Sequence, residues 1–324
     1  MMLERSIEIL WLTGPGALRD SPPAVGVAIV LTKPDISSRA ALALFLTIIL
    51  VWGINWPVTK AIVAHIPPLW TAAIRTAIAT VALFGLLAAL RKLSVPKRGD
   101  LPVVVAIGVF HMVLFSALMT AGLKYVPAGR SVVLGYTTPL WVAPGAWLFL
   151  KEPLPARRIV GIMIGLAGLA VLFNPLTFEW RDQQAVYGNA LLLLAALAWS
   201  VSILYVRAHR WISTPFQLVF WEALLAAVLL TGAAAWFEGT PKFEWTPALA
   251  LGLAYSGVIS TALGFWAMAV VNRGLPATVT SLGILGTPVV GIIVSVLFLN
   301  EPINMPLVLA TTLILLGIGW GTSR

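Results

Sequence analysis

The few residues of this 324-residue chain that could do chemistry are isolated within long apolar stretches. His111 is the eleventh residue of the apolar segment 101–123, and Arg75 and Glu222 each lie in another such segment. Ionisable groups placed this deep usually face a protein interior or a water-filled cavity. A neutral His111 imidazole can hydrogen-bond a carboxylate or an ammonium group, whereas Glu222 can bind a proton or an ammonium group. The alternatives are a bond from His111 to a backbone carbonyl, and pairing or snorkelling of Arg75 and Glu222.

The groups that a catalytic or metal centre requires are missing. The chain has no cysteine and three histidines, and no aspartate lies within any long apolar segment. Thiol catalysis, disulfides and thiolate metal sites are therefore excluded. A hydrolytic site would need a serine–histidine or paired-aspartate arrangement, and His111 has no acid near it in sequence. We predict no catalytic residue, no metal site and no cofactor, with an integral-membrane enzyme as the alternative from a different class.

Small polar and aromatic residues also lie deep in the apolar segments. Ser260 follows His111 by 149 residues, and Asn55 lies close to Pro57, which frees a helix carbonyl. A polar group beside a freed carbonyl can receive a charged headgroup, although small polar residues also join helices in bilayers. Aromatic residues can form a wall for apolar groups or hold an ammonium group, with packing against lipid as the alternative. The candidate binding residues are His111, Ser260, Asn55, Tyr136, Trp199, Tyr255 and Trp266.

The segments that carry these residues have the length and composition of membrane-spanning helices. Apolar residues make up 60% of the chain and charged residues 10%, against roughly 45–50% and about 25% in soluble domains. Ten segments reach the roughly 20 residues that a helix needs to cross the hydrocarbon core. We therefore predict an all-α integral membrane fold with ten transmembrane helices, in the plasma (inner) membrane.

The basic residues predict how these helices are oriented. The net charge is +9, and most of the positive charge lies in the short connections. If the N-terminus is cytoplasmic, thirteen Lys or Arg residues lie on the cytoplasmic side and five on the other. Cytoplasmic connections carry the excess of Lys and Arg, so we predict both termini inside. The positive charge thus reflects orientation in a lipid bilayer, and no nucleic-acid partner is expected.

One sequence pattern occurs twice, 149 residues apart. The tripeptide at 126–128, Val-Pro-Ala, returns as Leu-Pro-Ala at 275–277. The Glu-Pro pair that begins at Glu152 returns at Glu301, in each case directly after an apolar run. We therefore divide the chain into a first repeat and a second repeat, preceded by a tail whose role is not predicted; the boundaries are 1–37 for the tail, 38–175 for the first repeat and 186–322 for the second.

The number of helices in each repeat determines their relative orientation. Each repeat holds five spanning-length segments. Five is an odd number, so the two repeats must lie upside down relative to each other in the membrane. Inverted repeats place a substrate site near the bilayer midplane and permit alternating access to its two sides. This organisation is typical of a transporter.

Proline and glycine interrupt equivalent helices of the two repeats. Pro139 frees the carbonyl of Gly135, and Pro288 interrupts the corresponding helix close to Gly286. Two such breaks in inverted halves indicate a binding site and a hinge. The alternative is that glycine and proline are simply commoner in membrane helices than in soluble ones. We predict that Gly135, Pro139, Gly286 and Pro288 form the hinges.

The first repeat resembles one EamA unit in a series of residues. These are Leu123-Lys124-Tyr125-Val126-Pro127-Ala128, Pro139, Phe149-Leu150-Lys151-Glu152-Pro153-Leu154, Gly161, Gly165 and Gly168, and the second repeat has Pro288, Glu301-Pro302 and Gly317. Tandem EamA units characterise the drug/metabolite transporter superfamily, and the resemblance covers residues 38–322. It implies a ten-helix carrier of small metabolites, and the aromatic-rich spans resemble bacterial aromatic amino-acid exporters. The second repeat lacks the Lys-Tyr pair, so no function is assigned to Lys124 or Tyr125.

The sequence and this resemblance together predict a secondary transporter that exports small metabolites. Amino acids with bulky or aromatic side chains are the expected substrates, and we expect a monomer in the lipid bilayer. The alternative within the superfamily is a sugar-phosphate or nucleotide-sugar exchanger. Such a protein should carry basic residues deep in its late helices. The segment 274–300 contains none, and Arg75 is the only deep base of the first repeat.

Overall fold

The computed structural model describes residues 37–322 except 175–177, 242, 276–278 and 281–282. All regular secondary structure in this part of the chain is helical. The predicted tail lies outside the described residues apart from Ser37, whose hydroxyl accepts a hydrogen bond from the Ala40 amide at 3.2 Å and so caps the first helix. A serine in this position satisfies one of the free amides of the first helical turn.

The first repeat contains five helical segments, which we call spans whatever their length, and two of them are interrupted. The third span combines a short 3₁₀ turn, two α-helices and a π-helical segment, whereas the fourth breaks into two α-helices after residue 135. In chain order the elements are α1 (Ser38–Val63), α2 (Pro68–Ala89), η1 (Arg98–Asp100), α3 (Leu101–Ala106), η2 (Ile107–Phe115), α4 (Ser116–Tyr125), α5 (Ala128–Gly135), α6 (Thr138–Leu150) and α7 (Ala156–Leu172).

The described part of the second repeat follows the same order. Its third span again has a π-helical segment between two α-helices, and its elements are α8 (Gln183–Ala208), α9 (Pro215–Phe237), α10 (Pro247–Ala254), η3 (Tyr255–Leu263), α11 (Gly264–Gly274), α13 (Gly286–Leu299) and α14 (Met305–Thr322). Within the described residues, eight helices are long and apolar enough to cross a membrane. The helix α7 has 17 residues and α13 has 14, so both are shorter than these eight.

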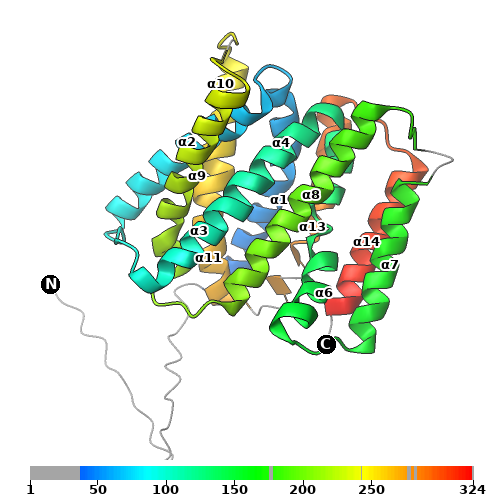
Figure 1. The fold of residues 1–324 in the computed structure, drawn as a ribbon, viewed down its shortest axis with the longest axis horizontal. Coiled ribbons are helices and arrows are strands. Elements are labelled where there is room, and N and C mark those ends of the chain that lie inside the picture. The colour runs from blue at the N-terminus through cyan, green and yellow to red at the C-terminus, as the bar shows by residue number, and fades with distance from the viewer. Residues whose placement is uncertain (1–36, 175–177, 242, 276–278, 281–282, 323–324) are drawn as a thin grey trace, which may run out of the picture. The chain divides into compact units, whose positions relative to one another are not determined.

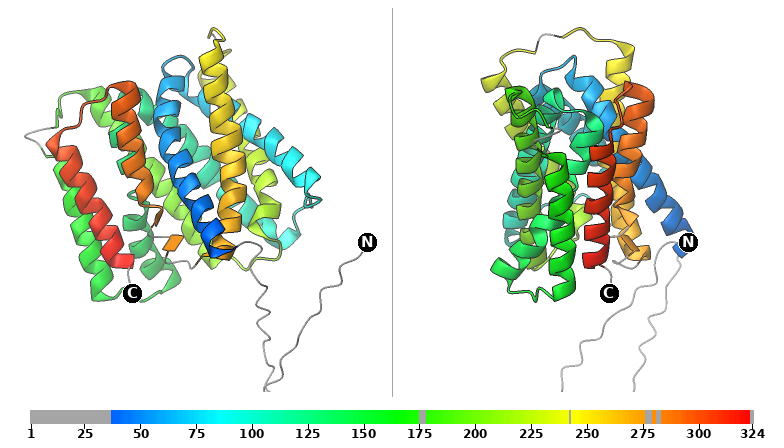
Figure 2. Two further views of the ribbon diagram at one scale, coloured as in Figure 1. Left: turned by 180° about the vertical axis from the view of Figure 1, so that it is seen from behind. Right: turned by 90° about the vertical axis from the view of Figure 1, so that its right-hand side faces the viewer.

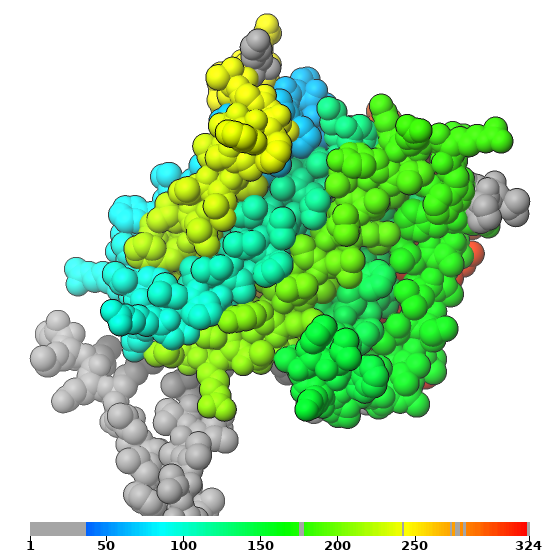
Figure 3. All heavy atoms as spheres, in the orientation of Figure 1, coloured from blue at the N-terminus to red at the C-terminus, as the bar shows by residue number. Residues whose placement is uncertain are grey.

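Helices of one repeat pack mainly against helices of the other. The principal pairs are α7 with α14, α2 with α9, α1 with α13, and α4 with α8. Figures 1 and 2 show α7 and α14 side by side along one edge of the bundle. On the face seen in Figure 3, the side chains of α3, η2 and α4, which form the third span of the first repeat, lie directly against those of α8. The two repeats therefore form one intertwined helical bundle rather than two separate domains.

Glycines permit the close contact between α7 and α14. A Cβ atom added to Gly161 would lie 2.8 Å from the Cα of Gly321, and one added to Gly168 would lie 2.8 Å from the carbonyl oxygen of Ala310. Real side chains do not approach backbone this closely, so only glycine fits at these two positions. Small residues at helix interfaces allow the backbones of membrane helices to approach each other.

The predicted breaks at the paired prolines occur at helix ends rather than within continuous helices. Helix α5 ends at Gly135, and Pro139 lies in the first turn of α6. Proline is well tolerated there because the amides of the first turn have no helical partner. The Gly135 carbonyl accepts a hydrogen bond from the Thr138 hydroxyl at 2.8 Å. In the second repeat, Pro288 likewise lies in the first turn of α13, which starts at Gly286.

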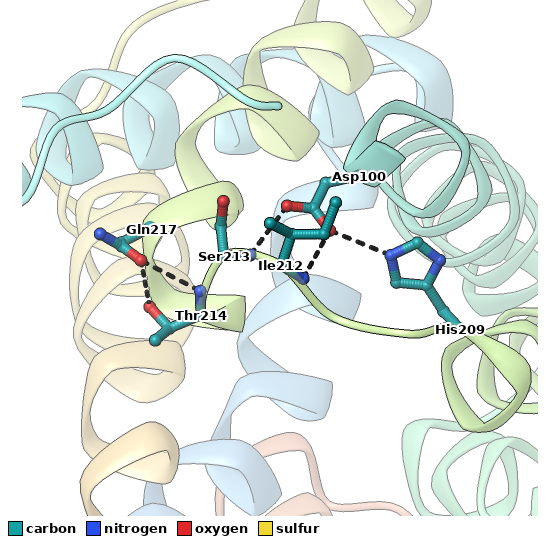
Figure 4. Close-up of polar contacts among 6 residues, drawn as sticks. All are labelled: Asp100, His209, Ile212, Ser213, Thr214 and Gln217. Atoms are coloured by element: carbon teal, nitrogen blue, oxygen red, sulfur yellow. Dashed lines mark hydrogen bonds and ion pairs between the residues drawn. The ribbon is translucent and has the colours of Figure 1, made fainter. Parts of the chain in front are cut away.

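A buried aspartate joins the start of the third span to the connection between α8 and α9 (Figure 4). Asp100 is fully buried, and its carboxylate accepts hydrogen bonds from the backbone amides of Ile212 at 3.1 Å and Ser213 at 2.8 Å. The Nε2 atom of His209 lies 3.1 Å from the same carboxylate. Three partners satisfy this carboxylate, which is required because an unpaired buried charge is costly. The contact holds this end of the bundle together.

Candidate functional site

The third spans of the two repeats contain matched π-helical segments. The segment η2 starts at Ile107 and η3 starts at Tyr255, 148 residues later, and each has nine residues. Such widened turns are rare and occur frequently at functional sites. His111 lies within η2 and Ser260 within η3. The repeat symmetry therefore brings two irregular helices to the middle of the bundle.

Both π-helical segments border one cavity. Its volume is about 130 Å³, close to the roughly 150 Å³ of an apolar protein cavity that admits benzene. Residues of both repeats line it: Trp52, Asn55, Trp56, Arg75, Thr76, His111, Met112, Phe115, Ser116, Met119, Tyr136, Trp199, Ala223, Ser260, Thr261 and Phe265. Large aromatic side chains provide much of this wall, with a small number of polar groups among them. This composition is typical of a small-molecule site.

Five of the seven residues proposed from sequence as binding residues line this cavity, and they are His111, Ser260, Asn55, Tyr136 and Trp199. Tyr255 and Trp266 are not among the lining residues. The hydroxyl of Tyr255 donates a hydrogen bond to the carbonyl of Val51 at 2.9 Å, which joins η3 to α1. Trp266 packs in an apolar cluster around Phe45.

The rings around His111 form a continuous aromatic wall. The imidazole stacks on Trp199 with the ring centroids 5.1 Å apart and the planes 6° from parallel. Phe115 lies 5.1 Å from Trp199 at a tilt, and Tyr136 meets Trp199 edge to face at 6.0 Å. Such geometries are favourable for aromatic pairs. The stacking fixes the orientation of His111, and no hydrogen bond among the described residues ties its imidazole to a backbone carbonyl.

Polar groups of α1 contact the π-helical segment of the second repeat. The Asn55 amide oxygen accepts a hydrogen bond from the Ser256 hydroxyl at 2.8 Å. The indole Nε1 of Trp52 donates to the backbone carbonyl of Ser260 at 2.9 Å. This bond connects α1 directly to the backbone of η3. These two bonds attach α1 to the cavity wall and leave the Asn55 amide nitrogen as a possible donor to a ligand.

Arg75 is the charged residue that sequence reasoning did not place in the binding site. Only 8% of it is exposed, and its Nη2 donates to the Ser116 hydroxyl at 2.8 Å. The Nε atom makes no hydrogen bond with any described residue. Glu222 is also buried, and its Oε1 has no hydrogen-bond partner among the described residues. No ion pair between Arg75 and Glu222 occurs among the described residues, so the pairing considered from sequence is not formed.

Several aromatic lining residues also escaped the sequence analysis, namely Trp52, Trp56, Phe115 and Phe265. Their only sequence signal is that they are aromatic residues in spanning segments that also carry polar groups. Within the described part of the chain, no group of three or more His, Asp or Glu residues could hold a metal ion. The arrangement can therefore bind a small, partly aromatic molecule through stacking, hydrogen bonds and one guanidinium group.

Comparisons with known proteins agree with this architecture. The chain is 29% identical to the "Uncharacterized transporter YvbV" of Bacillus subtilis (strain 168), over 87% of this chain and 90% of that relative. It is 26% identical to a "Probable amino-acid metabolite efflux pump" of Escherichia coli (strain K12), over 87% of this chain and 94% of the relative. A solved crystal structure with 22% identity has the same fold, with a TM-score of 0.60 over 87% of this chain and 96% of that one.

The family model described as the EamA-like transporter family matches the chain in two tandem units, residues 39–174 and 186–320. These two matches include most of the chain and agree with the doubled sequence pattern. Together with the apolar helices, they identify a multi-pass membrane protein whose family moves small molecules across the bilayer. The chain is a member of the EamA-like transporter family, within the drug/metabolite transporter superfamily.

Proposed function

We propose that this protein is a secondary transporter that exports amino acids, with a preference for bulky or aromatic side chains. The observation that carries the proposal is the cavity between the repeats, whose wall combines stacked aromatic rings with polar groups from both halves. An aromatic wall gives a favourable surface for an apolar side chain, and the polar groups suit a charged headgroup. The names of the efflux-pump relatives support the same substrate class at low identity.

The size and charge of the cavity argue against the alternative substrates. A volume of about 130 Å³ suits a single small ring system rather than a sugar attached to a nucleotide. A sugar-phosphate carries two negative charges at neutral pH, whereas Arg75 is the single Lys or Arg among the lining residues. We therefore keep the sugar-phosphate and nucleotide-sugar exchanger only as the alternative that the transport assay must test.

The transport cycle that we propose is alternating access by a monomer with ten membrane helices and both termini in the cytoplasm. The short helix starts at Thr138 and Gly286 give the two repeats matched points of bending. Rocking of one repeat against the other around a fixed site would expose the cavity to each side in turn. The Gly135, Pro139, Gly286 and Pro288 hinges belong to this proposal.

The direct test is uptake of labelled phenylalanine and alanine into liposomes that contain the purified protein, with sugar phosphates and nucleotide sugars as competitors. His111→Ala should weaken amino-acid transport by about tenfold to a hundredfold, because both a stacking ring and a hydrogen-bonding group are lost. Leu316→Ala is the matched control, since Leu316 is 60% exposed on the outside of the bundle.

Two outcomes would contradict the proposal. Transport of phenylalanine at the parental rate by the His111→Ala protein would place the substrate elsewhere. Competition by sugar phosphates, together with no uptake of amino acids, would favour the exchanger.

Trp199→Ala should reduce phenylalanine transport more than alanine transport, because the lost indole forms part of the aromatic wall. Trp266→Ala should affect both substrates equally, because Trp266 does not line the cavity.

A further inference from the structure

The cavity is unbalanced in charge. Among the described residues that line it, Arg75 is the only Lys, Arg, Asp or Glu. A guanidinium group remains positively charged even when it is buried, because its pKa in water is far above neutrality. A buried charge without a counter-ion is costly, and a ligand of opposite charge removes that cost. The cavity is therefore prepared for an anionic group and offers no carboxylate to a cationic one.

The hydrogen-bonding capacity of the Arg75 guanidinium group is only partly used by the described residues. The Nη2 atom is held by the Ser116 hydroxyl at 2.8 Å, which positions the guanidinium plane at the start of α4. The Nε atom has no hydrogen-bond partner among the described residues and is buried from solvent. Guanidinium groups bind carboxylates through two parallel N–H···O bonds, which gives both strength and orientation. Ser116 thus acts as a positioning residue for a carboxylate receptor.

The buried carboxyl group of Glu222 does not complete a zwitterion site. Glu222 is 4% exposed on α9, but only its neighbour Ala223 lines the cavity. The remaining lining groups that could meet an ammonium group are neutral hydroxyl, amide and imidazole groups and the faces of aromatic rings, and all of these attract a cation more weakly than a desolvated carboxylate does. His111 stacks against Trp199, so it supplies an aromatic face and a neutral hydrogen-bonding edge.

We infer that this site recognises its substrate through the carboxylate group, which binds Arg75, and that the α-ammonium group of an amino acid is dispensable. This inference deepens the proposed function and rests on it for the location of the site. The class of substrate then widens to small monocarboxylates with an aromatic or bulky apolar body, whether or not they carry an amino group. Amines of the same shape without a carboxylate are excluded, because they would place a second positive charge beside the buried guanidinium.

Three molecules with the same phenyl body test the inference on the unaltered protein. 3-Phenylpropionate carries only the carboxylate, 2-phenylethylamine carries only the ammonium group, and phenylalanine carries both. Binding to the detergent-solubilised full chain is measured by calorimetry. We expect 3-phenylpropionate to bind within about threefold of phenylalanine, and the amine to bind at least about tenfold more weakly. An amine that binds as tightly as 3-phenylpropionate would overturn the inference.

Variants of Arg75 identify the residue that discriminates among these molecules. Arg75→Gln should weaken both carboxylates by about tenfold to a hundredfold and leave the amine unchanged or improved. Arg75→Lys retains the positive charge but loses the two parallel N–H donors. Its affinity for the two carboxylates should therefore lie between that of the unaltered protein and that of Arg75→Gln. Glu222→Gln is the control for altering a buried ionisable residue outside the cavity wall, and it should leave the order of the three ligands unchanged. If Glu222→Gln instead abolishes the preference for carboxylates, Arg75 is not the receptor.

The same measurements separate this inference from the proposed function. If liposomes transport no amino acid, yet 3-phenylpropionate binds the unaltered protein at least about tenfold more tightly than the amine does, the amino-acid proposal fails and carboxylate recognition stands. If phenylalanine is transported but the amine competes as well as 3-phenylpropionate does, the function stands and the inference fails. Because the ligand series uses the unaltered protein, a misfolded Arg75 variant does not prevent either result.

Discussion

The two Glu-Pro turns are copies of one sequence, yet they make different contacts. At the α13–α14 turn, the Glu301 carboxylate accepts hydrogen bonds from the amides of Ala128 at 2.6 Å and Gly129 at 2.9 Å, in the first turn of α5. At the α6–α7 turn, Glu152 instead forms an ion pair of 2.7 Å with Arg207. Figures 1 and 2 show these turns at opposite ends of the bundle. One turn is therefore fastened by backbone amides and the other by a second side chain.

The basic partners of the two turns are also equivalent positions with different roles. Lys60 and Arg207 are 147 residues apart and correspond in the repeats. The Lys60 ammonium donates to the carbonyls of Leu123 and Val126, the latter at 3.0 Å, and so joins α1 to the end of α4 beside Glu301. In the pair of Arg207 with Glu152, the two side chains are 42% and 30% exposed.

Under the alternating-access cycle proposed above, this difference gives the two ends of the bundle unequal contacts at their Glu-Pro turns. Amides at a helix start carry partial positive charge, so a carboxylate bound to two of them forms strong, directed hydrogen bonds. An exposed ion pair is screened by water and salt and contributes little. The Glu-Pro turn at Glu301 is thus more firmly held than the turn at Glu152. Substitutions that weaken the two turns should therefore have unequal effects on the balance between the two closed states.

The largest expected effect tests whether the two turns lie on opposite sides of the membrane. Leu154 and Ile303 occupy corresponding positions just after the two Glu-Pro pairs, and the chain has no cysteine of its own. Single-cysteine variants at these two positions should be labelled by a membrane-impermeant reagent from opposite faces, an all-or-none difference. Labelling of both from the same face would mean that the repeats are not inverted, and the comparison of two ends would no longer apply.

The second prediction concerns a substitution that weakens the more firmly held turn, at Glu301. Glu301→Gln replaces a carboxylate that binds two amides by a neutral group that can accept only weaker hydrogen bonds. Bonds to charged groups are worth about 1.5–3 kcal/mol each, so the state closed at this end should lose at least about a tenfold preference. The measurement is the labelling rate of a cysteine at Thr76, a cavity residue, from the side of Glu301. An unchanged labelling rate would show that Glu301 does not hold this end closed.

Much of this architecture could be predicted from the sequence because its signals are local. Apolar runs predicted ten spans, of which eight are helices long enough to cross a membrane within the described residues. The doubled Glu-Pro pairs predicted two equivalent turns, and the paired prolines marked the breaks after Gly135 and before Gly286. The breaks were predicted at the right prolines, but the sequence did not predict that each proline lies in the first turn of a new helix. A kinked continuous helix and a new helix start both place proline near a free carbonyl, and the sequence does not distinguish them.

The candidate site was predictable only in part because side-chain direction depends on packing. His111 and Ser260 were found from depth and repeat position, and both line the cavity. Tyr255 lies at an equally suitable depth, but it starts a π-helical segment and its hydroxyl bonds α1 instead. A π-helical turn changes the face of the helix on which each following residue lies, and no local residue pattern predicted such a turn here. Arg75 was underrated because snorkelling explained it equally well from sequence.

A moderate effect is expected from the prolines. In Pro139→Ala, the new amide can donate to the Gly135 carbonyl, which now accepts only the Thr138 hydroxyl among the described contacts. One added backbone bond is worth about 0.5–1.5 kcal/mol and opposes bending at this break, so transport should slow by about two- to tenfold while expression is retained. Pro288→Ala should act similarly at the other break. Parental transport rates in the doubly substituted protein would show that these residues are packing features rather than hinges.

The smallest effect is expected at the exposed ion pair of Arg207 with Glu152, and the equivalent substitution at Lys60 provides the comparison. Arg207→Met removes a partner of Glu152 whose side chain is 42% exposed, which should change the balance between the two closed states by less than about 1 kcal/mol, or fivefold. Lys60→Met removes the equivalent residue at the other end, where the ammonium group satisfies at least two carbonyls. Its effect on labelling at Thr76 should therefore be several times larger and less sensitive to salt. Equal effects of the two substitutions would mean that both ends are held with similar strength, and the asymmetry would then lie in the helices rather than in their turns.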